Sequence, residues 1–143
     1  MMTEERLKDE FYLLSQAFSV KQFKLTSNTL TIALQTNSRK IYTVRIDLVN
    51  YPYDVPKVFI TSPKPLLDRS GRSMLSASHP MHTLQGENGC TRVCHYGPSQ
   101  WHPGVYLYQV VVKVRIWLEV YENHLKTGYP LDRYLSTAPE RRI

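Results

Sequence analysis

The fold is decided by the stretch KIYTVRIDLVNYPYDVPKVFIT, residues 40–61. Its first half alternates apolar and polar side chains, and this period of two, with β-branched residues, is typical of a half-buried strand. The apolar set is Tyr42, Val44, Ile46 and Leu48. Pro52 and Pro56 cannot lie inside a central strand, so YPYDVP predicts a stiff bend, at which an Xaa-Pro bond can be cis. KVFIT, residues 57–61, is the next strand, and a connection this short joins antiparallel strands.

Two further strands are expected before this stretch. NTLTIALQT, residues 28–36, alternates in the same way, and the polar turn TNSRK connects it to the next strand as a hairpin. KQFKL, residues 21–25, is expected to form the first strand. The sequence therefore predicts a four-stranded antiparallel sheet. Residues 62–104 follow without a periodic segment, and so long a loop inside a compact domain is usually functional.

Helices are predicted before and after the strands. Residues 4–18 carry an apolar stripe at helical spacing, and Thr3 is a suitable N-cap. The stripe consists of Leu7, Phe11, Leu14 and Phe18. Residues 106–126 carry a longer stripe, and Gly128 ends that helix. This order of elements predicts an α+β fold in which helices pack against one sheet. We expect a single domain over residues 1–143, with residues 136–143 as a loose tail.

The composition limits the class of protein. The chain has 143 residues, of which 42% are hydrophobic and 21% charged, which is typical of a globular domain with one core. No apolar run could span a bilayer, and MMTEERLKDEF does not resemble a signal peptide, so we expect a cytoplasmic protein without membrane contact. The net charge is +6, but the basic residues of 20–72 are dispersed, which favours a solvated basic face or contact with an acidic protein surface over nucleic-acid binding.

Both cysteines lie in the stretch GCTRVCHYGPSQWHP, residues 89–103. In a reducing cytosol, two cysteines so close in the sequence are expected to be free thiols rather than a disulfide. From the residues alone, Cys94 is either a small buried hydrophobe or a reactive nucleophile. A third interpretation is a zinc site formed by His79, His82, Cys90 and Cys94, although the separation of its two pairs is short for a zinc finger.

The order of these motifs resembles the ubiquitin-conjugating enzyme (UBC) family. YPYDVPKVFITSP is similar to the family's Tyr-Pro-x-x-x-Pro-x-x-x-Phe segment, which leads through the fourth strand. In the family, a histidine, a catalytic cysteine in an extended loop and a Trp-x-Pro follow, and His82, Cys94 and the WHP that begins at Trp101 take these places. The family's spacing from cysteine to tryptophan matches Cys94 and not Cys90.

The resemblance is closer to a stand-alone bacterial branch of the family, through MHTLQ, TRVCHYGPSQW and YENHLKTGYPLD. Proteins of that branch are encoded beside cyclic-oligonucleotide synthases in antiviral (CBASS) operons. The resemblance implies a cysteine-dependent acyltransferase, in which Cys94 accepts a protein C-terminus as a thioester and transfers it to an amine or another nucleophile. The implied donor is a cGAS-like nucleotidyltransferase or a ubiquitin-like protein, with an activating enzyme where one is needed, and no cofactor or metal is implied.

Five residues are candidates for supporting the chemistry of Cys94. They are His82, Asn88, His95, Tyr96 and Trp101. His82 and His95 would favour the thiolate form of Cys94, and His82 could instead brace the loop by a side-chain hydrogen bond. Tyr96 would line the site, and Trp101 would anchor the loop. The family's eukaryotic His-Pro-Asn is missing, because Met81 follows His79-Pro80, and Asn88 is in the same loop.

Two other functions fit the same residues. Members of the family that lack the cysteine are binding modules, and this fold could likewise use its basic sheet face to hold an acidic protein. The presence of Cys94 favours the enzyme over this non-catalytic module. The zinc interpretation corresponds to a zinc-stabilised nucleic-acid binder, which elemental analysis would identify.

Overall fold

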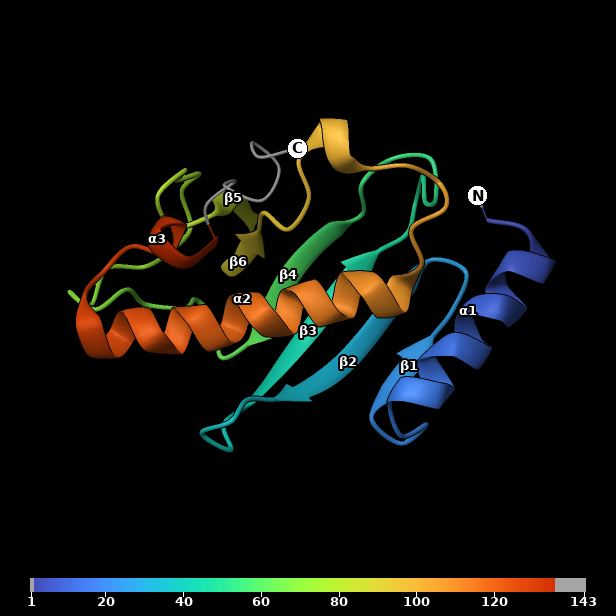
Figure 1. Ribbon diagram of the computed structural model, residues 1–143, viewed down its shortest axis with the longest axis horizontal. Helices are drawn as coiled ribbons and strands as arrows, with labels where there is room; N and C mark the ends of the chain where they lie inside the picture. Colours follow the sequence, from blue (N-terminus) through green and yellow to red (C-terminus); the bar gives the residue numbers. More distant parts are fainter. Residues whose placement is uncertain (1, 136–143) are drawn as a thin grey trace.

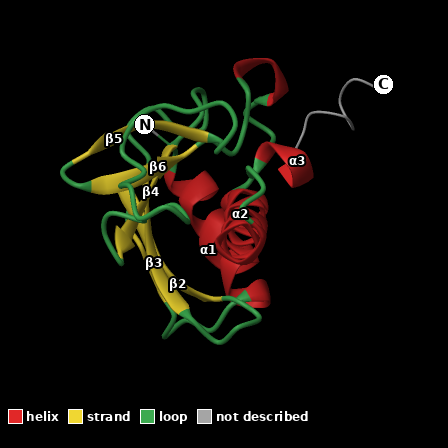
Figure 2. Ribbon diagram, turned by 90° about the vertical axis from the view of Figure 1, so that its left-hand side faces the viewer, coloured by secondary structure: helices red, strands yellow, loops and turns green. Residues whose placement is uncertain are grey.

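One antiparallel sheet and the helices on one of its faces form two layers in the computed structural model, which describes residues 2–135 (Figures 1 and 2). The helical elements are α1 (Glu4–Ala17), the 3-10 turn η1 (Pro98–Gln100), α2 (Leu107–Thr127) and α3 (Asp132–Leu135). The strands are β1 (Phe23–Leu25), β2 (Thr29–Gln35), β3 (Ile41–Asp47), β4 (Lys57–Ser62), β5 (Thr83–Glu87) and β6 (Cys90–Val93). They pair antiparallel in the order β1-β2-β3-β4-β6-β5. The predicted α+β class, with its N-terminal helix and long C-terminal helix, is confirmed.

Six strands occur in the described part of the chain, so the prediction of four was wrong. The two additional strands, β5 and β6, lie within residues 62–104, where the sequence shows no periodicity, and they extend the sheet beyond β4. Their turn is Asn88-Gly89, and both residues have positive φ, +53° and +77°, as a type I′ hairpin turn requires. A register shift interrupts the β5–β6 ladder, and β5 is mostly polar, so no alternation is visible in the sequence. The Asn-Gly pair was the available signal.

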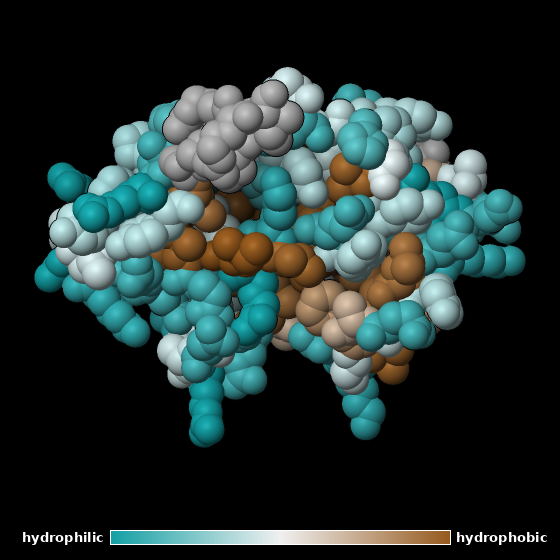
Figure 3. Space-filling view, viewed as in Figure 1, coloured by the Kyte–Doolittle hydropathy of each residue, from teal (hydrophilic) through white to brown (hydrophobic). Residues whose placement is uncertain are grey.

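The core lies between the sheet and α2. The stripe predicted over residues 106–126 is the buried face of this helix. Its buried side chains are those of Leu107, Val110, Val111, Val114, Trp117, Leu118, Tyr121 and His124. On the opposite side, the apolar positions predicted for residues 42–48 are all at most 1% exposed. The outer face of α2 also carries apolar side chains, among them Val112 and Ile116, which are 45% and 49% exposed. Figure 3 shows a band of apolar surface on the side of the molecule where α2 lies.

Helix α1 buries only part of its predicted stripe. Leu14 is fully buried, whereas Phe11 is 48% exposed. The Phe11 ring packs at the edge of the sheet, with its centroid 5.7 Å from that of Phe23 in β1. Thr3 is the N-cap, as predicted, and accepts a hydrogen bond from the backbone N–H of Arg6 at 3.0 Å. The helix therefore lies at one end of the sheet, where it covers less of the core than α2 does (Figure 1).

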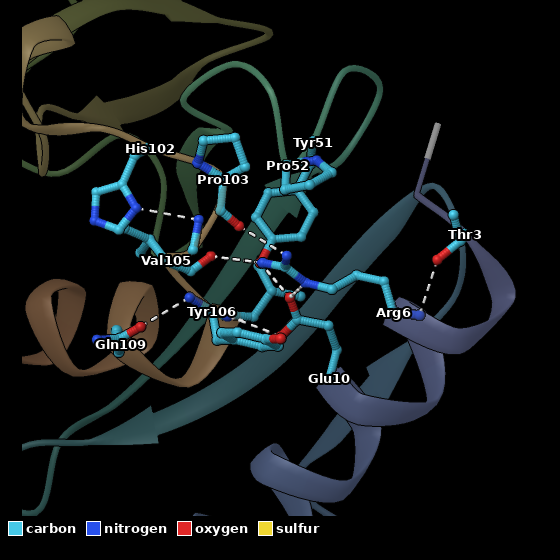
Figure 4. Close-up of polar contacts among 12 residues, drawn as sticks. Thr3, Arg6, Glu10, Tyr51, Pro52, His102, Pro103, Val105, Tyr106 and Gln109 are labelled. Carbon is cyan, nitrogen blue, oxygen red and sulfur yellow. Dashed lines mark hydrogen bonds and ion pairs between the residues drawn. The ribbon is translucent and has the colours of Figure 1, made fainter.

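A buried ion pair in α1 holds the chain that enters α2 (Figure 4). The fully buried carboxylate of Glu10 accepts hydrogen bonds from Arg6 Nε at 2.9 Å and from the Tyr51 hydroxyl. It also accepts from the backbone N–H of Leu107 at 2.9 Å, so it caps the first turn of α2. The Arg6 guanidinium donates to the carbonyl oxygen of Pro103 at 2.7 Å. This network joins α1, the proline bend and the loop that precedes α2.

None of the helices within residues 2–135 is both long and apolar enough to cross a membrane. The predicted loose tail, residues 136–143, lies outside the described residues. Three features of the fold position the site: the extended sheet, the buried network of α1, and α2 across the sheet.

Candidate functional site

A cavity of about 700 Å³ lies between the β5–β6 hairpin, the loop that follows it and α2. Its walls come from residues 77–79 before the hairpin, from most of residues 94–100 after it, and from Lys113, Ile116 and Trp117 of α2. Four of the six predicted site residues line this cavity. They are His82, Cys94, His95 and Tyr96. The volume falls in the range of ordinary ligand sites, about 300–1,000 Å³.

Cys94 directly follows β6 and is half-buried at the cavity wall. Its backbone N–H donates to the carbonyl oxygen of His82 at 2.9 Å, and the same oxygen accepts from Trp117 Nε1 at 3.0 Å. The thiol is free, as predicted. Burial raises the pKa of the Cys94 thiol, and the positive charge of Arg92 opposes this only in part. The resting residue is therefore a thiol and not the thiolate that the histidines and positive charge were expected to favour.

His82 forms a side-chain hydrogen bond that the sequence does not reveal. Its Nε2 lies 2.7 Å from Oδ1 of Asp132, the first residue of α3. Because a carboxylate only accepts, Nε2–H is the donor, and the proton of the neutral ring is on Nε2. The backbone N–H of Asp132 donates to the carbonyl oxygen of Pro80 at 2.8 Å, which fixes α3 beside this loop. His82 therefore both braces Cys94 through its backbone and carries an oriented imidazole.

His95 occupies the same wall in a different chemical state. Burial lowers the pKa of His95 to about 4, against the opposing hydrogen bond with the Val93 backbone, and Lys113 and Arg92 lower it further by repulsion. Its Nε2 atom is buried and has no hydrogen-bond partner among residues 2–135. The ring is therefore neutral at physiological pH, so it cannot supply the positive charge that was expected to stabilise a Cys94 thiolate.

Aromatic side chains support the loop after Cys94. The Trp101 indole lies with its ring centroid 5.3 Å from that of Tyr96 and 6.0 Å from that of Tyr51. Its Nε1 donates to the carbonyl oxygen of Pro52 at 2.9 Å. Trp101 does not line the cavity, and these contacts give it the anchoring position that the sequence indicates. Tyr96 lines the cavity with its ring under the Lys113 ammonium, 4.0 Å from the centroid.

Two predicted residues lie away from the cavity. Asn88 is exposed at the tip of the hairpin, where its role is to adopt the positive φ of the turn. Cys90 is buried at the start of β6 and does not line the cavity. Among residues 2–135, no three His, Cys, Asp or Glu side chains come together in a way that could hold a metal ion. The four residues of the zinc interpretation therefore do not form a zinc site.

The contact of Asp132 with His82 was not predicted from the sequence. Asp132 lies 50 residues after His82 in the chain, and the two meet only because α2 carries the chain back along the sheet. No local pattern distinguishes this aspartate from any other polar residue after a helix C-terminus. Lys113 was also missed, because a lysine on the outer face of a helix is ordinarily solvated.

The site brings together a free thiol, an imidazole held by a carboxylate and a cavity of about 700 Å³. A thiol and an imidazole beside a cavity are groups that could serve as nucleophile and base. Comparison of the chain with protein-family models, with curated proteins and with solved structures finds no significant match.

Proposed function

We propose that this protein is a ubiquitin-conjugating-enzyme-like acyl carrier, which holds a protein C-terminus as a thioester on Cys94 and passes it to an amine or another nucleophile. The observation that carries the proposal is the position of Cys94, a free cysteine at the wall of a cavity of about 700 Å³. A thioester carrier must present its sulfur to two successive partners, and a residue at the end of a hairpin, beside an open cavity, meets that requirement.

The surroundings of Cys94 support this function over a structural role. The loop after the cysteine is tied to the proline bend by the hydrogen bond from Trp101 to Pro52. The same loop is held from the other side through Arg6, which donates to the backbone of Pro103. A loop braced at two points can keep a reactive sulfur in place while large partners come and go. A merely buried cysteine would not need this support.

The proposed donor is the C-terminus of a cGAS-like nucleotidyltransferase in an antiviral operon, with a ubiquitin-like protein as the other candidate. The support for this step is the resemblance of the segments around His82, Cys94 and Trp101 to the stand-alone bacterial branch. In this proposal the protein acts in the cytoplasm, where the donor and ATP are available. An activating enzyme would supply the donor carboxyl group as an adenylate or as a thioester.

The test is a loading assay with ATP, the candidate donor and its activating enzyme. We expect a mass increase on the protein that reducing thiols remove, that persists in Cys90→Ala, and that is lost in Cys94→Ala. Cys94→Ser should instead trap an ester that resists thiols. Cys90→Ala is the matched control, because it removes the other cysteine of the same hairpin. No adduct with a donor whose activation has been verified would refute the proposal.

A non-catalytic binding module is the second candidate, and the exposed apolar face of α2 favours it. Val112 and Ile116 are about half-exposed, and Ile116 also lines the cavity. An apolar surface of this kind on a helix is typical of a contact site for another protein. The two candidates differ in their dependence on the thiol: partner binding and cellular function that survive Cys94→Ala favour the module.

A further inference from the structure

We propose that His82, oriented by Asp132, is the general base of this site: it takes the proton of the Cys94 thiol during acylation and that of the incoming nucleophile during transfer. This inference rests on the proposed acyl-carrier function and names the residues that move the protons in it. Asp132 is a positioning residue, because it acts through His82 and does not line the cavity.

The backbone places His82 next to Cys94. Thr83 pairs with Val93 in the β5–β6 ladder, so His82 and Cys94 are the next residues on the two strands. The hydrogen bond from the Cys94 N–H to the His82 carbonyl oxygen, at 2.9 Å, closes this pair. Both side chains line the same cavity.

The hydrogen bonds of the His82 ring leave one nitrogen available. Nε2–H donates to Asp132, which lies outside the cavity, so the ring turns this edge away from the cavity. Nδ1 therefore holds the lone pair, and it forms no hydrogen bond with any residue from 2 to 135. Nδ1 is not among the buried atoms without a hydrogen-bond partner in residues 2–135, which means that it has accessible surface. Solvent or a substrate can therefore reach it. An imidazole in this state is a proton acceptor.

The other titratable groups around His82 do not replace it. His79 also lines the cavity, with its ring 5.8 Å from the His82 ring, centroid to centroid, but its side chain is exposed and no carboxylate among residues 2–135 orients it. His95 lines the cavity, and its pKa of about 4 makes it a weak base. Lys113 of α2, the remaining charged group at the cavity, is a cation and accepts no proton at neutral pH. Because burial keeps Cys94 protonated, the reaction needs a base, and His82 is the imidazole at this cavity that a carboxylate orients.

Each step balances. In acylation, the thiol proton moves to His82 Nδ1, sulfur forms a bond to the carbonyl carbon of an acyl adenylate or acyl thioester, and the adenylate phosphate or the donor thiolate leaves with the electron pair. His82 then gives its proton to the leaving group or to water and is neutral again. In transfer, an amine attacks the thioester carbon and its proton moves to neutral His82. The C–S bond then breaks and the thiolate of Cys94 takes the proton back. No oxidant, reductant or metal enters either step.

The test uses p-nitrophenyl acetate as acyl donor to the full chain, because it needs no protein partner. Release of p-nitrophenolate is followed against pH, and the rate of Cys94→Ala is subtracted. In wild type, acylation should rise with pH in the neutral range, where a histidine loses its proton, before the thiol itself titrates. His82→Asn should remove this limb and slow acylation at pH 7 by about 10²–10⁴-fold. Asn suits the position because His82 has φ +52°, which asparagine tolerates.

Asp132→Asn should lower the same limb, by about tenfold or more, because the ring loses its charged acceptor. His102→Asn is the matched control: this histidine is exposed, lies outside the cavity, and its Nδ1 only accepts from the Gly104 N–H. Its profile should equal that of wild type. Circular dichroism checks folding. If His82→Asn and Asp132→Asn fail to fold, the solvent deuterium isotope effect on wild type decides, since base-assisted attack slows in D₂O and attack by a preformed thiolate does not.

Equal rates and profiles for His82→Asn and His102→Asn would overturn the proposal, as would the absence of an isotope effect. The failure of the general base and of the carrier function can be told apart. If a protein donor loads folded His82→Asn as fast as wild type, the carrier function stands and the base assignment fails. If acetylation depends on His82 but no protein donor loads Cys94, the base assignment stands and the carrier function fails.

Discussion

Replacing Glu10 by glutamine tests the buried network that joins α1 to the site. Glu10 is fully buried, and its carboxylate accepts from Arg6, from the Tyr51 hydroxyl and from the N–H of Leu107. Glutamine keeps the volume, and its amide oxygen can still accept from Leu107. Its NH₂ group would face the Arg6 Nε–H, so two donors would meet at a buried position.

The expected loss follows from the bonds that the carboxylate makes. Glu10→Gln removes two hydrogen bonds to a charged group, each worth about 1.5–3 kcal/mol. We therefore expect the free energy of unfolding to fall by about 3–5 kcal/mol, the usual result of breaking a buried ion pair. Since Arg6 also holds Pro103 at 2.7 Å, loosening this pair should reach the loop beside Cys94.

Urea unfolding followed by circular dichroism measures this loss, with the slope m compared between variants. Glu87→Gln is the matched control, because Glu87 pairs with Lys57 at 3.3 Å on the surface, with 42% and 50% of the two side chains exposed. A surface pair of this kind contributes about 0–1 kcal/mol. If Glu10→Gln costs no more than Glu87→Gln at equal m, the reasoning that Glu10 holds these segments together is refuted.

Three further predictions concern the hairpin and its neighbours. Gly89 has φ +77° with open space around it, so Gly89→Ala should lower the free energy of unfolding by about 1 kcal/mol. Gly86→Ala would place a Cβ 2.5 Å from the Cys90 carbonyl oxygen and should lower it by about 2–3 kcal/mol. Urea melts measure both losses, and equal losses would contradict this distinction. Burial lowers the pKa of His95 from 6.5 to about 4, so as the pH falls through this range the unfolded chain binds a proton at His95 that the folded chain does not bind. The free energy of unfolding should therefore fall with pH in this range, and it should fall less in His95→Gln. Urea melts at several pH values measure this difference. Burial raises the pKa of the Cys94 thiol. In Cys90→Ala, where Cys94 is the remaining cysteine, alkylation by iodoacetamide should therefore reach half its maximal rate at a higher pH in the folded protein than in the urea-unfolded protein. A folded-state midpoint at or below the unfolded one would count against this.

Local pattern explains why much of the fold was predictable. The alternation of residues 42–48 and the stripe of residues 106–126 are set by the period of a strand and of a helix, and each is visible within one segment. The strands β5 and β6 escaped because their side chains do not alternate, and only the Asn88-Gly89 turn marks them. Phe11 also departed from its predicted stripe, because α1 packs at the end of the sheet.

The sequence by itself determined the α+β order of elements, since the periods of helices and strands are visible along the chain. The choice of Cys94 as candidate nucleophile came from the resemblance of its surrounding motifs to the ubiquitin-conjugating enzyme family, and it stays a prediction. Only the tertiary structure decided the protonation chemistry of the site. The contact of His82 with Asp132 joins residues 50 positions apart, and its formation depends on the length and path of α2. The raised pKa of Cys94 and the lowered pKa of His95 arise from loss of water, which several packed elements cause together and no single segment encodes.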